Sequence, residues 1–233
     1  MSIAEKFEVI ADEVYEKGRQ DEWSDFWDIY QAKGERTDYR YAFGNGAGAT
    51  INFAWNETTF KPKYDIKPTL SVDRMFGFNS ITDLEGHLNG LGIKLDTSNC
   101  ANMSYMFLNS GNKIIPEISL ENAENCANLF GYASQVTTIR KVIFSEKNTG
   151  YASAFVACRN LTNIVADGVI ARNIDFKDCS LLTAESLDSI IKHLKNFVVA
   201  GSGSATITLH DDSKTLIGEE GIGQITAKGW SVM

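Results

Sequence analysis

The sequence predicts an α/β solenoid, in which short strands and turn or helical segments stack between an N-terminal helix and a C-terminal α/β cap. One observation is a phenylalanine that recurs every 21 to 33 residues, and the other is the tetrapeptide Asn-Cys-Ala-Asn, which occurs at 99–102 and again at 125–128. A period in the twenties is typical of units that cannot bury their own apolar face and therefore stack on one another. The recurring residues are Phe43, Phe76, Phe107, Phe130, Phe155 and Phe176.

The composition narrows the class of protein. The chain has 233 residues, of which 43% are hydrophobic and 22% charged, as in an ordinary folded protein. Its formal charge of -8 argues against a nucleic-acid partner, because phosphate binding needs clustered Lys and Arg. We expect no membrane span, because no run approaches the roughly 18 apolar residues that one needs. The first residues lack the basic and apolar regions of a secretory signal. We therefore expect cytoplasmic synthesis, with the final location left open.

Residues 1–36 are expected to form the N-terminal helix. Ile3, Phe7, Ile10 and Val14 follow the spacing of a heptad seam. Three interpretations stay open: a cap on the array, a homo-oligomer formed through residues 1–33, and a peptide that attaches another protein. Residues 37–92 are interpreted as a connector with degenerate first repeats.

Residues 93–182 are expected to hold the main repeats. Alternation of apolar and polar residues predicts strands at 93–96, 117–120, 141–144 and 173–176, with shorter strands at 138–139 and 161–165. Each of the four longer strands leads into a turn rich in small and polar residues. Asparagines at equivalent turn positions can satisfy backbone groups that a bend leaves unpaired. We expect their role to be structural.

Residues 183–233 are expected to form a helix and strand cap. Thr183 precedes a helix with apolar residues at helical spacing from Leu187 to Phe197. A strand is predicted at 205–209 and a short helix near 213–227. In the segment Lys228-Gly229-Trp230, the glycine suits a helix C-terminus, and the tryptophan is expected to fold back as a hydrophobic plug.

The segment Leu95-Asp96-Thr97-Ser98-Asn99-Cys100-Ala101-Asn102-Met103-Ser104-Tyr105-Met106-Phe107 closely resembles the repeat of BspA-like leucine-rich-repeat proteins. The match is firm over about 90–180. Two further segments, the connector at 60–65 and Lys228-Gly229-Trp230, resemble a narrower group from gut Firmicutes and their prophages. The resemblance implies a leucine-rich-repeat-like solenoid used for adhesion or recognition, with a possible place near phage tail genes.

No residue set in the sequence predicts catalysis, a metal or a cofactor. Cys100, Cys126, Cys158 and Cys179 are spaced like the repeats rather than like paired metal ligands, and we interpret them as small buried fillers. The three histidines are far apart in the sequence, and no nucleophile, metalloprotease or phosphate-loop motif occurs. We therefore expect a protein that is not an enzyme.

The leading hypothesis is a recognition or adhesion module that binds a protein or glycan through outward residues of its strands. Tyr105, Tyr132 and Tyr151 lie near the turns and are candidates for exposed aromatic contacts. The alternative is a structural or receptor-binding component of a phage tail, associated with the virion and oligomerised by the N-terminal helix. The candidate ligand-binding residues are Lys94, Asp96, Glu117, Ser119, Lys141, Ile143, Ser145, Asn173 and Asp175.

Overall fold

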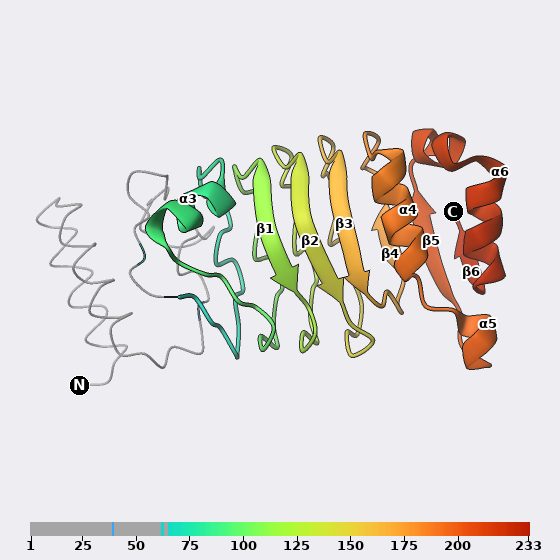
Figure 1. Cartoon of the computed structure of the whole chain (residues 1–233), viewed down its shortest axis with the longest axis horizontal. Helices are drawn as coiled ribbons and strands as arrows, with labels where there is room; N and C mark the ends of the chain where they lie inside the picture. The colour runs from blue at the N-terminus through green and yellow to red at the C-terminus, as the bar shows by residue number, and fades with distance from the viewer. Residues whose placement is uncertain (1–38, 40–61, 63–64) are drawn as a thin grey trace, which may run out of the picture.

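A computed structural model of the chain describes Tyr39, Pro62 and residues 65–233 (Figure 1). The predicted N-terminal helix, its role as a cap or oligomerisation device, and most of the connector lie outside the described residues.

The described part of the chain is an α/β structure with two small parallel sheets and four helices. The helices are α3 (Leu84–Leu91), α4 (Ala184–His193), α5 (Phe197–Ala200) and α6 (Asp211–Ala227). The first sheet has the order β1-β2-β3, and the second has the order β4-β5-β6. The strands are β1 (Ile114–Ser119), β2 (Thr138–Phe144), β3 (Asn163–Gly168), β4 (Ile174–Phe176), β5 (Ala205–Leu209) and β6 (Trp230–Val232).

The first sheet buries one face and exposes the other. Ile115, Ile139 and Ile164 lie side by side in the parallel register and are all buried. The register between β2 and β3 shifts after Ile139, so that Val142 pairs with Ala166. This β-bulge places two successive residues of β2, Arg140 and Lys141, opposite one residue of β3.

The core lies between the inner face of this sheet and the turn segments that precede or follow the strands. Five phenylalanine rings form a row within it. Centroids of successive rings are 5.5, 5.7, 5.3 and 4.5 Å apart from Phe76 through Phe107, Phe130 and Phe155 to Phe176. The recurring phenylalanine therefore marks core positions from Phe76 onward, whereas Phe43 lies outside the described residues.

The first sheet ends at β3 because α4 covers the free edge of that strand. Ser186 Oγ accepts a hydrogen bond from Ile164 N at 3.0 Å, and Ser189 Oγ accepts one from Ala166 N at 2.9 Å. Both hydroxyls also donate back, to the carbonyls of Thr162 and Ala166. The helix thus supplies through side chains the bonds that a fourth strand would supply through its backbone.

The predicted leucine-rich-repeat-like solenoid is wrong. Residues 65–233 do not form a solenoid, because their strands are divided between two separate three-stranded sheets with four helices. The spacing misled the prediction because parallel strands must be joined by a crossover of a dozen residues or more. Intervals in the twenties therefore suit any chain of parallel pairs. The strand expected at 93–96 is reduced to one isolated bridge between Leu95 and Ile66.

Of the predicted C-terminal elements, the strand at 205–209 is confirmed as β5, and the helix expected near 213–227 is α6, which begins at Asp211. The helix predicted from Thr183 to Phe197 is shorter than expected: α4 ends at His193, and Phe197 begins α5. The Lys228-Gly229-Trp230 segment joins α6 to α4: Lys228 Nζ donates to the carbonyls of Ile191 and Lys192 at 2.7 and 2.9 Å. Gly229 has a φ of 82°, and the indole of Trp230 donates to Lys195 O at 2.8 Å. Trp230 is buried, which confirms its role as a plug.

Within residues 65–233, no helix has the length and apolarity that crossing a bilayer requires.

Candidate functional site

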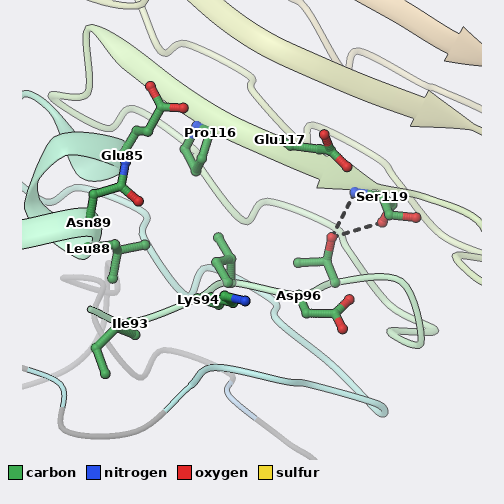
Figure 2. A pocket seen from close by; sticks show the side chains of 11 residues that line it. Glu85, Leu88, Asn89, Ile93, Lys94, Asp96, Pro116, Glu117 and Ser119 are labelled. Carbon is green, nitrogen blue, oxygen red and sulfur yellow. Dashed lines mark hydrogen bonds between the residues drawn. The ribbon is translucent and has the colours of Figure 1, made fainter. Parts of the chain in front are cut away.

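A groove of about 410 Å³ lies between α3, β1 and the segment at 93–97. Its apolar lining comes from Leu88, Ile93, Leu95 and Pro116. Charged and polar side chains surround this apolar part. Figure 2 shows Glu85 and Asn89 on α3, Lys94 and Asp96 on the segment between α3 and β1, and Glu117 and Ser119 on β1. The groove therefore gathers four of the nine predicted ligand-binding residues: Lys94, Asp96, Glu117 and Ser119.

The inner part of the groove is fixed by one hydroxyl. Thr97 Oγ1 donates to Ser119 O and accepts from Ser119 N, each at 2.9 Å (Figure 2). Ser119 Oγ in turn donates to Glu121 at 3.0 Å. Ser119 is only 8% exposed, so its prediction as an outward contact residue is wrong: its hydrogen bonds hold it against the neighbouring segment.

Asp96 is exposed and strongly hydrogen-bonded. Its Oδ1 accepts from the hydroxyl and backbone N–H of Ser98, at 2.7 and 3.0 Å. These bonds stabilise the carboxylate and hold the pKa of Asp96 below its usual value. Lys94 is also exposed, and its backbone N–H donates to Asp65. Both side chains are placed to meet a ligand at the open side of the groove.

Charges of alternating sign cross the outward face of the first sheet. Lys141 Nζ lies 2.8 Å from Glu117 Oε2, and this neighbour raises the pKa of Lys141. Arg140 Nε lies 2.6 Å from Glu85 Oε2 on α3. Asp167 on β3 also interacts with Lys141 and lies 3.9 Å from the Nε2 of His193. We call Glu85, Glu117, Arg140, Lys141 and Asp167 the charged sheet face.

A second groove, of about 560 Å³, follows the carboxyl ends of β1, β2 and β3. Ile143 and Ser145 line it, so two more predicted residues reach a concave surface. Ser145 Oγ donates to Glu121 O at 3.0 Å and accepts from Lys147 N. Its hydroxyl is thus occupied in holding the turn after β2.

Asn173 and Asp175 are not brought into this site. Asp175 lies on β4, in the other sheet, and Asn173 comes immediately before that strand. Asn173 Oδ1 accepts from Thr206 N at 2.9 Å, and Asp175 pairs with Lys177 at 3.3 Å. A single face of nine outward residues required one continuous sheet, and the division into two sheets removes these two residues from it.

Sequence reasoning missed Glu85, Asn89, Pro116 and Arg140. A signal for α3 was present, because Asp83 precedes an apolar pattern at Leu84, Leu88 and Leu91. Asp83 Oδ1 indeed accepts from Gly86 N and begins that helix. Arg140 had no such signal, since the bulge that turns it outward depends on the pairing of β2 with β3.

The charged and polar side chains that line the groove can form ion pairs and hydrogen bonds with a ligand. Among the described residues of its lining there is no His or Cys, and the carboxylates of Glu85 and Glu117 are paired with cations. Residues 65–233 contain no group of three or more His, Cys, Asp or Glu side chains that could hold a metal ion.

The four cysteines are free and buried, as predicted. Burial raises the pKa of Cys126 and Cys158 to about 12, which leaves their thiols uncharged near neutral pH.

No family model, curated protein or solved structure matches this chain. The resemblance of residues 95–107 to BspA-like proteins therefore stays a prediction.

Proposed function

We propose that this chain is a non-catalytic recognition module that binds a protein partner through the charged sheet face and the groove beside it. The observation that carries the proposal is the set of alternating charges on one exposed face. Exposed ion pairs contribute only about 0 to 1 kcal/mol each to folding stability. The same charges contribute far more to the choice of partner and to the rate of association.

The apolar neighbours of these charges support a protein partner. Val165 lies on β3 between the charged residues and is 50% exposed, and Pro116 lines the adjacent groove. An apolar centre with charged surroundings is the usual composition of a protein interface. A glycan, the other ligand considered for this face, gains little from ion pairs, so the charge pattern favours a protein.

Charge reversal tests the proposal. The double variant Arg140→Glu/Lys141→Glu and the wild-type chain are immobilised, and the proteins that each retains from an extract of the producing cells are quantified. The matched control is Lys177→Glu/Lys214→Glu, which makes the same change in charge and also breaks two exposed ion pairs away from this face.

We expect the proteins retained by the wild type to be retained by the control and reduced at least about tenfold on the Arg140→Glu/Lys141→Glu variant. Circular dichroism melting of all three proteins shows whether each is folded. Equal retention by the two double variants would contradict the proposed role of the charged sheet face.

A further inference from the structure

A second surface of the molecule is built from turn segments that contain no charged residue of their own. Residues 97–112, 125–139 and 148–158 contain no Asp, Glu, Lys, Arg or His, although 22% of the chain is charged. These segments include the turns whose phenylalanines enter the core. The core is filled from the other side by the inner face of the first sheet. The outer side of the turns therefore lies across the core from the charged sheet face.

Six residues with left-handed backbone conformations define this surface, which we call the turn face. Their φ values lie between 48° and 58°. Backbone hydrogen bonds join neighbouring turns: Tyr105 N donates to Ala127 O and Asn128 N to Ala152 O, while Asn109 N donates to Gly131 O and Tyr132 N to Val156 O. The six residues thus form two columns. They are Tyr105, Asn128 and Ser153 in one column and Asn109, Tyr132 and Ala157 in the other. Arg74 and Phe78, which also have positive φ, continue the two columns at one end, and Asp178 Oδ2 accepts from Ala157 N at 2.8 Å at the other end of the second.

Folding alone does not explain why Tyr132 occupies its position. A left-handed conformation suits glycine and is tolerated by asparagine, but it is unfavourable for a bulky side chain. Tyr132 is also 55% exposed, so its ring gains little from burial. Within residues 65–233, its hydroxyl has no hydrogen bond and its ring meets no other aromatic ring or cation. The recurring turn sets this backbone angle, since Arg74 and Phe78 have it too. A bulky ring kept exposed at such an unfavourable position supports a role in binding.

The two tyrosines differ in what covers them. The guanidinium carbon of Arg74 lies 4.3 Å above the centre of the Tyr105 ring. Tyr132 instead has Asn109 on one side and Ala157 on the other. The side chain of Ala157 ends at its methyl group, and its N–H donates to Asp178 Oδ2 at 2.8 Å. A ring-sized ligand can lie over that methyl group against the face of Tyr132, with the Asp178 carboxylate nearby. Ser153 and Asn128 belong to the adjacent column and offer a hydroxyl and an amide.

We propose that the turn face binds a neutral saccharide, with one sugar ring stacked on Tyr132. The negative face of an aromatic ring attracts the polarised C–H groups of a sugar. Asn and Ser side chains both donate and accept, as sugar hydroxyls require. Tyr, Ser, Gly and Asn together form the adaptable, uncharged set that recognition loops use. The charged groups at the ends of the columns already have partners: Arg74 pairs with Asp73 at 2.9 Å, and Asp178 Oδ2 accepts from Ala157 N at 2.8 Å. A neutral ligand therefore suits the residues between them. The proposal is independent of the proposed function of the sheet.

The test titrates the full chain with linear neutral hexasaccharides, namely cellohexaose, xylohexaose, mannohexaose, maltohexaose and chitohexaose, by saturation-transfer NMR. We expect at least one to bind, and Tyr132→Ala to weaken that binding by about tenfold, the effect of losing one aromatic contact. Tyr132→Phe keeps the ring and should stay within about threefold of wild type.

Tyr132→Asn separates a binding role from a structural one. Asparagine suits the left-handed backbone, so the variant should unfold at a higher urea concentration than wild type while losing saccharide binding. The Arg140→Glu/Lys141→Glu variant should bind the saccharide as the wild type does. The proposals for the turn face and for the charged sheet face can therefore fail separately. Absence of binding to all five probes, unchanged binding by Tyr132→Ala, or tighter binding of a hexamer of galacturonic acid would each overturn the proposal.

Discussion

The left-handed backbone of Ala157 predicts how a substitution there changes the stability of the protein. Its φ is 57°, a conformation that costs an L-residue roughly 1 to 2 kcal/mol and glycine nothing. We predict that Ala157→Gly raises the free energy of unfolding by about 1 kcal/mol, as measured by urea denaturation.

The matched control is Ala152→Gly in the same turn. Ala152 is exposed and has no positive φ. Adding a glycine there only increases the freedom of the unfolded chain, so we expect stability to fall by about 0.4 to 1 kcal/mol. If both variants shift stability in the same direction, the left-handed conformation at Ala157 is not the source of the difference.

Residue-scale predictions from the sequence succeeded where burial alone decided the outcome. The cysteines and the phenylalanines from Phe76 onward were predicted as core residues and are buried. Of the tyrosines proposed as exposed, Tyr132 is exposed and Tyr105 is partly buried, but Tyr151 is buried against Phe144 with ring centroids 5.3 Å apart. The difference was not predictable, because it depends on which strand lies beneath each turn.

At the scale of elements, the contact between α4 and β3 offers a test of the edge-covering role of the helix. Ser186 is buried, and its hydroxyl serves both Ile164 N and Thr162 O. We predict that Ser186→Ala lowers the free energy of unfolding by about 1 to 3 kcal/mol, because the buried N–H of Ile164 loses its partner. Thr162 O keeps the hydrogen bond from Thr183 N. Urea denaturation measures the loss.

A second buried helical serine provides the control. Ser213 on α6 is 1% exposed, and its Oγ has no hydrogen bond partner in the described residues. Removing an unsatisfied hydroxyl costs nothing in hydrogen bonding, so Ser213→Ala should be neutral or stabilising. A similar loss in both variants would mean that helix packing, not the covered strand edge, determines the effect at Ser186.

Most elements after residue 113 could be predicted from local patterns, whereas their pairing could not. The strand at 205–209 has the predicted bounds, and β2 joins the two short segments predicted at 138–139 and 141–144. Alternation with a period of two does not reveal a bulge, so Arg140 was assigned to no face. It also does not reveal that a helix, rather than a strand, follows β3 in space.

At the scale of the whole molecule, the buried thiols predict a loss of stability in alkali. Burial raises the pKa of Cys126 and Cys158 to about 12 from an ordinary value of 9.0, and it raises the pKa of Cys179 as well. Below pH 9 the thiols are protonated in both the folded and the unfolded chain. Above it, the unfolded chain releases protons that the folded chain keeps, so stability falls as the pH rises toward 12.

Each such thiol contributes up to about 1.4 kcal/mol per pH unit within that range. We predict that the urea midpoint falls steadily between pH 9 and pH 10.5 and that Cys158→Ala reduces the slope of this fall. Burial raises the pKa of Tyr151 too, which adds a decline of the same sign at higher pH. An identical slope in Cys158→Ala and wild type would show that other groups cause the alkaline loss.

The whole fold was the least predictable level. The period of the phenylalanines correctly marked a row of core rings, yet that row does not specify how the strands are grouped. Two sheets with helices between and beside them satisfy the same spacing as one curved sheet. The predicted site assumed one continuous sheet. Asn173 and Asp175 were therefore grouped with residues of the first sheet, which they do not contact.

The charge-free turn segments have a further consequence for experiments on the molecule. Dissolved salt screens interactions between exposed charges over roughly 8 to 10 Å at ordinary ionic strength, but it leaves contacts between neutral groups almost unchanged. Ligands of the charged sheet face should therefore dissociate as sodium chloride is added, while a ligand of the turn face stays bound. A single salt gradient would then separate the two sides of this protein without any mutation.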